Sequence, residues 1–241
     1  MGYIFTKGKT MTLASRLFAL LPELRVHSEN DWGSTNSTFT AFNDGGVECE
    51  VGEYLYSMVR MLKPTRVLET GTHHGIGALY MALALHDNLS DIAPDVVGKL
   101  DTIEYLPENH QIASDRLARA GLSGFVECHL RNIKDFNPKD TEYQMIFLDT
   151  EPDSRFSELV KFYPNLSQGG YIFIHDTPRG LCQGNVNPDH PRLKSWPFGD
   201  IPKELNELVT NGELSVFYLP NPRGLIGFYK PHKDDYKWMK K

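Results

Sequence analysis

Between Pro64 and His175 short apolar runs alternate with stretches of helical periodicity, and few folds accommodate that alternation. Because strands that alternate with helices usually pair in parallel, the pattern predicts an α/β domain whose central strands are buried on both faces. The predicted helices include Gly77–His86, Pro107–Ala120 and Ser154–Leu166. The predicted strands are Arg66–Thr70, Leu100–Tyr105, Phe125–Leu130, Met145–Asp149 and Tyr171–His175.

The C-terminal part of the chain follows a different pattern. A last helix is predicted from about Pro202 to Asn211, and it is followed by two strands, Leu214–Leu219 and Leu225–Tyr229. A short turn, Pro220–Gly224, joins these strands, so they should run antiparallel. The predicted fold class is therefore a Rossmann-like, doubly wound α/β sheet, mostly parallel, with a C-terminal antiparallel hairpin.

The first part of the chain has its own composition. Apolar residues at helical spacing predict helices over Met11–Leu21 and Val51–Leu62. Between them, the polar segment Ser28–Gly46 is interpreted as irregular structure that either forms a lid or only packs on the core. We therefore divide one compact unit into 1–62, an N-terminal helical extension and lid, and 63–241, the main domain.

Charge and cysteine content exclude several classes of protein. A formal net charge of -6 leaves no basic surplus to neutralise phosphates, so a nucleic-acid partner is disfavoured. Cys49, Cys128 and Cys182 are odd in number and widely spaced, which favours a reducing compartment, the cytoplasm, over a disulfide framework. Since no apolar run approaches the roughly 20 residues of a membrane helix, we expect no membrane partner.

A glycine-rich segment, Glu69-Thr-Gly-Thr-His-His-Gly-Ile-Gly77, follows the first central strand and opens the next helix. Glycines let the backbone approach a ligand closely, and the N-terminus of a helix presents N–H groups to an anion. The spacing ExGxxxGxG differs from the dinucleotide GxGxxG, and no GK[ST] follows for a phosphate loop. The segment is thus a candidate loop for another cofactor, or a plain structural turn.

Acidic residues stand at the ends of three predicted strands. Glu104 ends the second strand, where a carboxylate can accept hydrogen bonds from both hydroxyls of a ribose, although it could equally be a solvated charge. Ligands of open α/β sheets gather at the carboxyl ends of the strands, so Asp149, His175 and Asp176 should face the same ligand.

Four segments occur in an order that resembles a known family: Val67–Gly75, Thr102–Glu104, Met145–Asp149 and Gly169–Asp176. From about Val51 to Tyr229 the chain resembles small class I O-methyltransferases, of the catechol and caffeoyl-CoA type and of the macrocin O-methyltransferase-like group. The resemblance implies the seven-stranded class I methyltransferase fold and S-adenosylmethionine as the cofactor.

The resemblance also implies how the cofactor is bound. Glu69, Gly71 and His73 would line its methionine part, Glu104 would bind the ribose, and Asn132 would lie by the adenine. A glycine stands where the catechol type has a serine for the methionine carboxylate, which leaves that carboxylate to backbone N–H groups or to His73. The whole implied cofactor-binding set is Glu69, Gly71, His73, Gly75, Gly77, Glu104, Asn132 and Asp149.

Methyl transfer to a hydroxyl requires that the acceptor be aligned with the methyl carbon and lose its proton. In the catechol type, two aspartates and an asparagine hold Mg²⁺ and a lysine acts as the base, but here Thr177 and Pro152 replace the asparagine and the lysine. Two interpretations stay open: Asp149, Asp176 and His175 bind Mg²⁺ or another divalent cation, or His175 is the general base. In the plainer alternatives Asp149 only orients a ligand and His175 is a core histidine.

The expected catalytic residues are therefore His175, Asp176 and Asp149. The polar stretch Pro178–Pro202 follows them, and together with Ser28–Gly46 we interpret it as the acceptor pocket rather than an idle insertion.

The expected function is S-adenosylmethionine-dependent O-methylation of a small polar molecule, such as a sugar or a secondary metabolite. The alternatives are nitrogen, RNA or protein as the acceptor, or a cofactor-binding protein without turnover. We expect a small-molecule methyl acceptor as the partner and allow for a homodimer.

Overall fold

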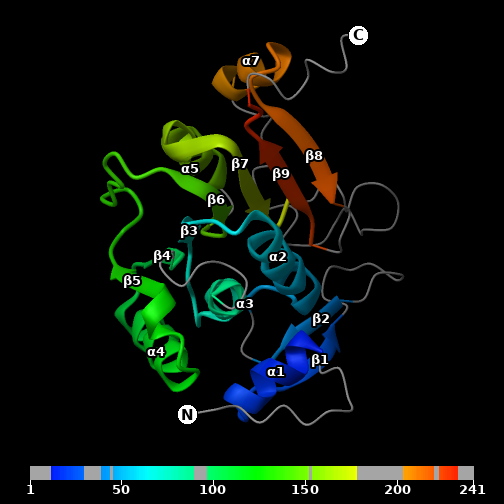
Figure 1. Cartoon of the computed structure of the whole chain (residues 1–241), viewed down its shortest axis with the longest axis vertical. Helices are drawn as coiled ribbons and strands as arrows, with labels where there is room; N and C mark the ends of the chain where they lie inside the picture. The colour runs from blue at the N-terminus through cyan, green and yellow to red at the C-terminus, as the bar shows by residue number, and fades with distance from the viewer. Residues whose placement is uncertain are drawn as a thin grey trace.

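The computed structural model describes residues 12–29, 39–43, 46–89, 97–151, 154–177, 203–219 and 223–232. At its centre is a seven-stranded sheet in the order β5-β4-β3-β6-β7-β9-β8 (Figure 1). Its strands are β3 (Arg66–Thr70), β4 (Lys99–Glu104), β5 (Val126–Leu130), β6 (Tyr143–Leu148), β7 (Leu166–His175), β8 (Ser215–Leu219) and β9 (Leu225–Tyr229). The strands from β3 to β7 pair in parallel, whereas β9 runs antiparallel to both of its neighbours. The predicted fold class is thereby confirmed.

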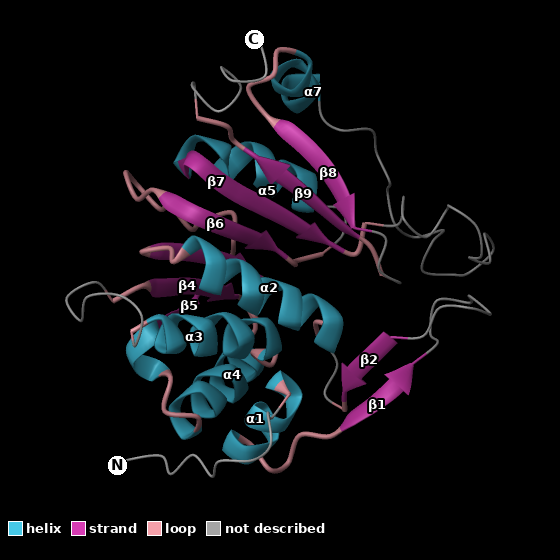
Figure 2. Ribbon diagram, turned by 45° about the vertical axis from the view of Figure 1, so that its right-hand side comes forward, coloured by secondary structure: helices cyan, strands magenta, loops and turns pink. Residues whose placement is uncertain are grey.

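Helices cover both faces of this sheet (Figure 2). On one face lie α2 and α3, with α1 and α4 beside them, and on the other lie α5 and α7. The helices are α1 (Leu13–Leu20), α2 (Cys49–Leu62), α3 (Ile76–Asn88), α4 (Pro107–Arg119), α5 (Arg155–Phe162) and α7 (Lys203–Thr210), with short 3-10 turns at Ser123–Phe125 and Tyr163–Asn165. None of the helices in the described ranges is both long and apolar enough to traverse a bilayer.

Alternation along the strands explains why the sheet needs two layers of helices. In β6, Met145 and Phe147 join the core under α2 and α3, while Ile146 and Leu148 join the core under α5. Successive side chains of a strand point to opposite faces, so a strand that is apolar at consecutive positions is buried on both. Helix α3 is itself buried almost all round, because α2 packs over the side that the sheet leaves open.

The N-terminal part differs from the prediction. Where irregular structure was expected in Ser28–Gly46, the structure has an antiparallel hairpin of β1 (Val26–Glu29) and β2 (Phe39–Phe42). Two strands of four residues each show too little alternation to be recognised from sequence. The hairpin is held by burial, since Phe42 is fully buried and its ring lies 6.0 Å from that of Phe18.

Most element boundaries differ by one or two residues from the prediction, and two differ by more. Strand β7 begins at Leu166 rather than Tyr171, and α5 ends at Phe162 rather than Leu166, because Tyr163–Asn165 forms a 3-10 turn. Neither shift alters the end of β7, which is where the candidate site begins.

Candidate functional site

The loop between β3 and α3 adopts backbone conformations that few residues tolerate. Gly71, His73 and Gly75 all have positive φ, at 79°, 49° and 83°. A Cβ atom on Gly71 would lie 2.2 Å from the carbonyl oxygen of Asp149, just beyond the end of β6. The loop therefore lies directly against the end of β6, and only a glycine permits that approach.

Glu69 is buried at the bottom of this loop. A Cβ atom on Gly77 would lie 2.3 Å from its Oε1, so the first turn of α3 is also closed around the carboxyl group. The Thr102 hydroxyl donates to Glu69 Oε2 at 2.5 Å. Burial raises the pKa of Glu69 to about 8, and the nearby charges of Asp149 and Glu104 add to the effect. At neutral pH the group is therefore largely a neutral acid.

Glu104, at the end of β4, ties the loop to the neighbouring strand. Its Oε2 accepts the backbone N–H of His73 at 2.8 Å, and its Oε1 accepts those of Tyr105 and Leu106 at 2.9 and 2.8 Å. A carboxylate offers about four acceptor positions, so these bonds leave it able to accept a further donor. Glu104, the residue expected to bind the ribose, thus lies beside the glycine-rich loop.

The loop histidines form a stacked pair. The rings of His73 and His74 lie 4.0 Å apart and are nearly parallel, and Arg116 donates to the carbonyl oxygen of His74 at 3.0 Å. Burial, together with the proximity of the His74 ring, lowers the pKa of His73. His73 is therefore a neutral imidazole that can offer a hydrogen bond without a competing charge.

Asn132 lies two residues beyond β5 and is exposed. Its Oδ1 accepts the backbone N–H of Lys134 at 2.9 Å, and Arg131 N–H donates to the carbonyl oxygen of Glu104 at 2.8 Å. The second contact brings the ends of β4 and β5 together, so Asn132 lies on the same edge of the sheet as Glu104.

Six buried or nearly buried ionisable residues meet beyond the ends of β6 and β7, and we call them the charged cluster. They come from the start of α2, the ends of the two strands, the start of α5 and the segment before β9. The members are Glu48, Asp149, Arg155, His175, Asp176 and Arg223.

His175 is the centre of the cluster and is completely buried. Its Nδ1 lies 3.0 Å from Asp149 Oδ1, and its Nε2 lies 2.7 Å from Glu48 Oε2. Burial alone would lower the pKa of His175, but the charges of Asp176, Glu48 and Asp149 raise it to about 10. At neutral pH both ring nitrogens therefore carry protons and donate to carboxylates.

Arg155 joins the two aspartates. Its Nη2 lies 3.0 Å from Asp149 Oδ1 and 3.3 Å from Asp176 Oδ2. The rest of the guanidinium is held by backbone, since Nε donates to Thr150 O at 2.8 Å and Nη1 to His175 O at 2.5 Å. Both contacts fix the group independently of the carboxylates.

Arg223 contacts Asp176 from the other side. Its Nη2 donates to Asp176 Oδ2 at 2.9 Å, and its Nε forms an ion pair with Oδ1 at 2.7 Å. Its Nη1 donates to Gly46 O at 2.7 Å and lies 3.3 Å from Glu48 Oε2. Burial alone would raise the pKa of Asp176 and of Glu48, but His175 and Arg223 hold both below their usual range.

Three cluster members were not predicted from sequence: Glu48, Arg155 and Arg223. Glu48 directly precedes α2, where an acidic residue is unremarkable. Arg155 carried a weak signal, because a cation in the first turn opposes the helix dipole and implies a partner. Arg223 lies in a turn whose sequence gives no hint of a buried contact.

The expected metal ligands do come together. Ligand atoms of Asp149, His175 and Asp176 all lie within 4.8 Å of one another. The segment Pro178–Pro202 and Pro152 lie outside the described residues. Asp101, Glu127 and His129 form a second group of this kind, but its members lie within β4 and β5 rather than at the strand ends, and Arg66 and Tyr143 already bind Asp101.

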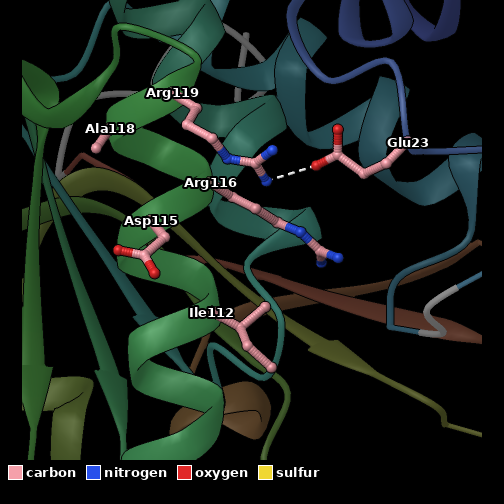
Figure 3. Close-up of a pocket in the computed structure, with 6 residues that line it drawn as sticks. All are labelled: Glu23, Ile112, Asp115, Arg116, Ala118 and Arg119. Atoms are coloured by element: carbon pink, nitrogen blue, oxygen red, sulfur yellow. Dashed lines mark hydrogen bonds and ion pairs between the residues drawn. The ribbon is translucent and has the colours of Figure 1, made fainter.

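A hollow of about 600 Å³ is lined by residues of α4 and by Glu23. Figure 3 shows it along α4, with Arg119 reaching across to Glu23. Its lining includes none of the cluster or loop residues, so we do not count it as part of the candidate site.

Comparison with known proteins finds similarity to methyltransferases over part of the chain. Residues 68–177 match the family described as "Methyltransferase domain". The chain is 28% identical over 130 residues to a catechol O-methyltransferase of Niastella koreensis, a match that covers 52% of this chain and 54% of the relative. The chain thus aligns with about half the length of that relative.

Solved structures share the fold. A methyltransferase of Podospora anserina with bound S-adenosylhomocysteine is 21% identical, with a TM-score of 0.63 over 93% of this chain and 100% of that one. The O-methyltransferase TomG of Streptomyces achromogenes, in complex with S-adenosylmethionine, is 21% identical, with a TM-score of 0.58 over 79% and 83% of the two chains.

Proposed function

We propose that this chain is an S-adenosylmethionine-dependent methyltransferase and that it transfers the methyl group to a hydroxyl oxygen of a small polar molecule. The proposal depends on one observation: the glycine-rich loop and the charged cluster lie next to each other. The glycine-rich loop approaches so closely that Gly71 contacts the backbone of Asp149, and Asp149 belongs to the charged cluster. A cofactor in the loop and an acceptor at the cluster would therefore be neighbours.

The cofactor half of the site is proposed from the loop and the strand ends. Glu104 would accept the ribose hydroxyls, and Asn132 would lie near the adenine. The first turn of α3, which follows Gly75 and includes Gly77, would present backbone N–H groups to the methionine carboxylate, because helix N–H groups at that end have no partner within the helix. A neutral Glu69 would gain a partner when the cofactor's ammonium arrives.

The acceptor half of the site is proposed from the solvent exposure of the carboxylate side chains. Of the three carboxylates in the cluster, the side chain of Asp149 is 13% exposed, against 5% for Asp176 and 0% for Glu48. Asp149 is thus the one that can reach a bound molecule. We assign it as the group that contacts the acceptor hydroxyl, with Asp176 and His175 as positioning residues.

In the proposed reaction the cofactor supplies an electrophilic methyl group on a sulfonium. The bond between sulfur and methyl carbon breaks, its electron pair stays on sulfur, and the acceptor oxygen forms the new bond to carbon. Asp149 accepts the hydroxyl proton as this bond forms and later releases it to solvent. The products are the methyl ether and S-adenosylhomocysteine.

The geometry does not favour the expected role of His175 as the general base. A base needs a free lone pair within reach of the acceptor, but both nitrogens of His175 face carboxylates and the ring is completely buried. Its two hydrogen bonds would instead hold Asp149 in one orientation.

The class of the acceptor and the cellular compartment are also proposals. The acceptor class follows from the relatives, among them the catechol O-methyltransferase of Niastella koreensis. We place the enzyme in the cytoplasm because Cys49 and Cys128 are free thiols. Assistance by Mg²⁺, the other expectation, conflicts with the two arginines that already contact Asp149 and Asp176.

The test is transfer of labelled methyl groups from S-adenosylmethionine to a panel of hydroxylated sugars and phenols. The expected product carries the label on oxygen, and Asp149→Asn should lower turnover by about 100-fold or more with little change in cofactor affinity. Asp115→Asn, an exposed change of the same chemistry on α4, is the matched control. Label on nitrogen, or cofactor binding without any product across the panel, would refute the proposal.

A further inference from the structure

Three groups at the cluster have the spacing of a cation site. Ligand atoms of Asp149, His175 and Asp176 lie within 4.8 Å of one another. Carboxylate oxygens at such distances suit Mg²⁺ or Mn²⁺, which bind oxygen ligands at roughly 2.1 Å. Spacing alone would therefore assign a divalent cation here.

The imidazole does not fit that assignment. A histidine binds a metal ion through the lone pair of a neutral ring nitrogen. In His175, Nδ1 lies 3.0 Å from Asp149 and Nε2 lies 2.7 Å from Glu48. Each ring nitrogen thus already has a carboxylate oxygen within hydrogen-bond distance, so an ion could bind the ring only by displacing one of these carboxylates.

The two aspartates already share a cation. Arg155 Nη2 lies 3.0 Å from Asp149 and 3.3 Å from Asp176, which is where an ion bridging both carboxylates would bind. Arg223 contacts both oxygens of Asp176. Backbone carbonyls hold the two guanidinium groups in these positions, at Thr150 and His175 for one and at Gly46 for the other.

Every carboxylate of the cluster already lies beside a guanidinium group. Arg155 contacts Asp149 and Asp176, and Arg223 contacts Asp176 and Glu48. A divalent ion would add two positive charges in a buried place next to these two arginines. Uncompensated buried charge is strongly unfavourable, so an ion could enter only if an arginine left.

We propose that Arg155 and Arg223 take the place of a divalent cation between Asp149 and Asp176, so that the site binds no divalent metal. Both arginines are positioning residues, since Arg155 holds Asp149, which faces the acceptor, and both arginines hold Asp176. The inference deepens the proposed function and rests on it for its meaning in catalysis.

The experiment uses Mn²⁺ as the probe, with bound ion measured by electron paramagnetic resonance on the full chain without acceptor. Wild type should show no stoichiometric site at millimolar Mn²⁺. Arg155→Gln removes the bridging charge and leaves an amide that can itself bind a cation. This variant should therefore bind Mn²⁺ at least about tenfold more tightly than the wild type does. A second change, Asp149→Asn, should abolish the gain, and Arg155→Lys, which keeps the charge, should gain nothing.

Stoichiometric Mn²⁺ in wild type, lost in Asp149→Asn, would overturn the inference, and so would a folded Arg155→Gln chain that gains no site. If Arg155→Gln does not fold, the wild-type titration and Arg155→Lys still decide. The readout does not depend on turnover. A chain that makes product but binds Mn²⁺ contradicts this inference alone, and one that binds no Mn²⁺ and makes no product contradicts the proposed function alone.

Discussion

Gly71→Ala should destabilise the chain far more than Gly121→Ala, although both glycines have similar positive φ angles. Their φ angles are 79° and 72°. A Cβ atom on Gly121 would meet nothing within 4 Å, whereas one on Gly71 would lie 2.2 Å from Asp149 O. The pair thus separates the cost of the left-handed conformation from the cost of the close approach.

The magnitudes follow from these two terms. A side chain in the left-handed region costs roughly 1–2 kcal/mol, which is all that Gly121→Ala should lose. Gly71→Ala adds a steric overlap that the end of β6 must relieve, for about 1–3 kcal/mol more. One kcal/mol corresponds to about 2–4 °C in a domain of this size, so the two melting temperatures should differ by several degrees.

The assay is thermal unfolding followed by circular dichroism, with calorimetric titration of S-adenosylhomocysteine on the same samples. Gly71→Ala should also weaken S-adenosylhomocysteine binding, because the loop cannot keep its place beside Asp149, while Gly121→Ala should not. Equal losses of melting temperature, or unchanged affinity in Gly71→Ala, would show that the close approach of loop and strand is misread.

Two further predictions concern carboxyl groups of the cofactor half. Glu104→Gln should weaken S-adenosylhomocysteine binding by about 1.5–3 kcal/mol, the range for hydrogen bonds to a charged group, and the exposed change Glu108→Gln should not; equal calorimetric affinities would contradict a ribose role. Burial raises the pKa of Glu69 from 4.5 to about 8, so the folded chain keeps a proton that the unfolded chain loses, and stability should fall as pH rises between these values. Glu69→Gln should flatten that part of the curve in urea titrations at several pH values, and an unchanged slope would assign the pH dependence to other groups.

The elements of the fold could largely be predicted because their signals are local. Strand β3 and strand β9 were predicted with their observed bounds, since runs such as Leu225–Tyr229 are bounded by turn residues. The hairpin of β1 and β2 was missed because its strands are short and its stability comes from packing of Phe42 under α1 and α3. No local pattern records such a contact.

The residues of the candidate site also fall into those that local sequence signals predict and those that depend on distant contacts. Glu104, Asp149 and Asp176 were found from their positions at strand ends, which parallel topology brings to one edge. Glu48 was not found, because its partner His175 lies 127 positions away. The charge balance of the cluster depends on such distant pairs, so the expectation of a metal ion could be weighed only once the fold was known.

A crystal structure of the full chain with S-adenosylhomocysteine tests the central claim most directly. The account predicts that the ribose hydroxyls bind Glu104, that the carboxylate meets the first turn of α3, and that the sulfur faces Asp149, with both arginines in place. A ligand bound elsewhere, or a sulfur directed away from Asp149, would contradict the claim that methyl transfer takes place at the charged cluster.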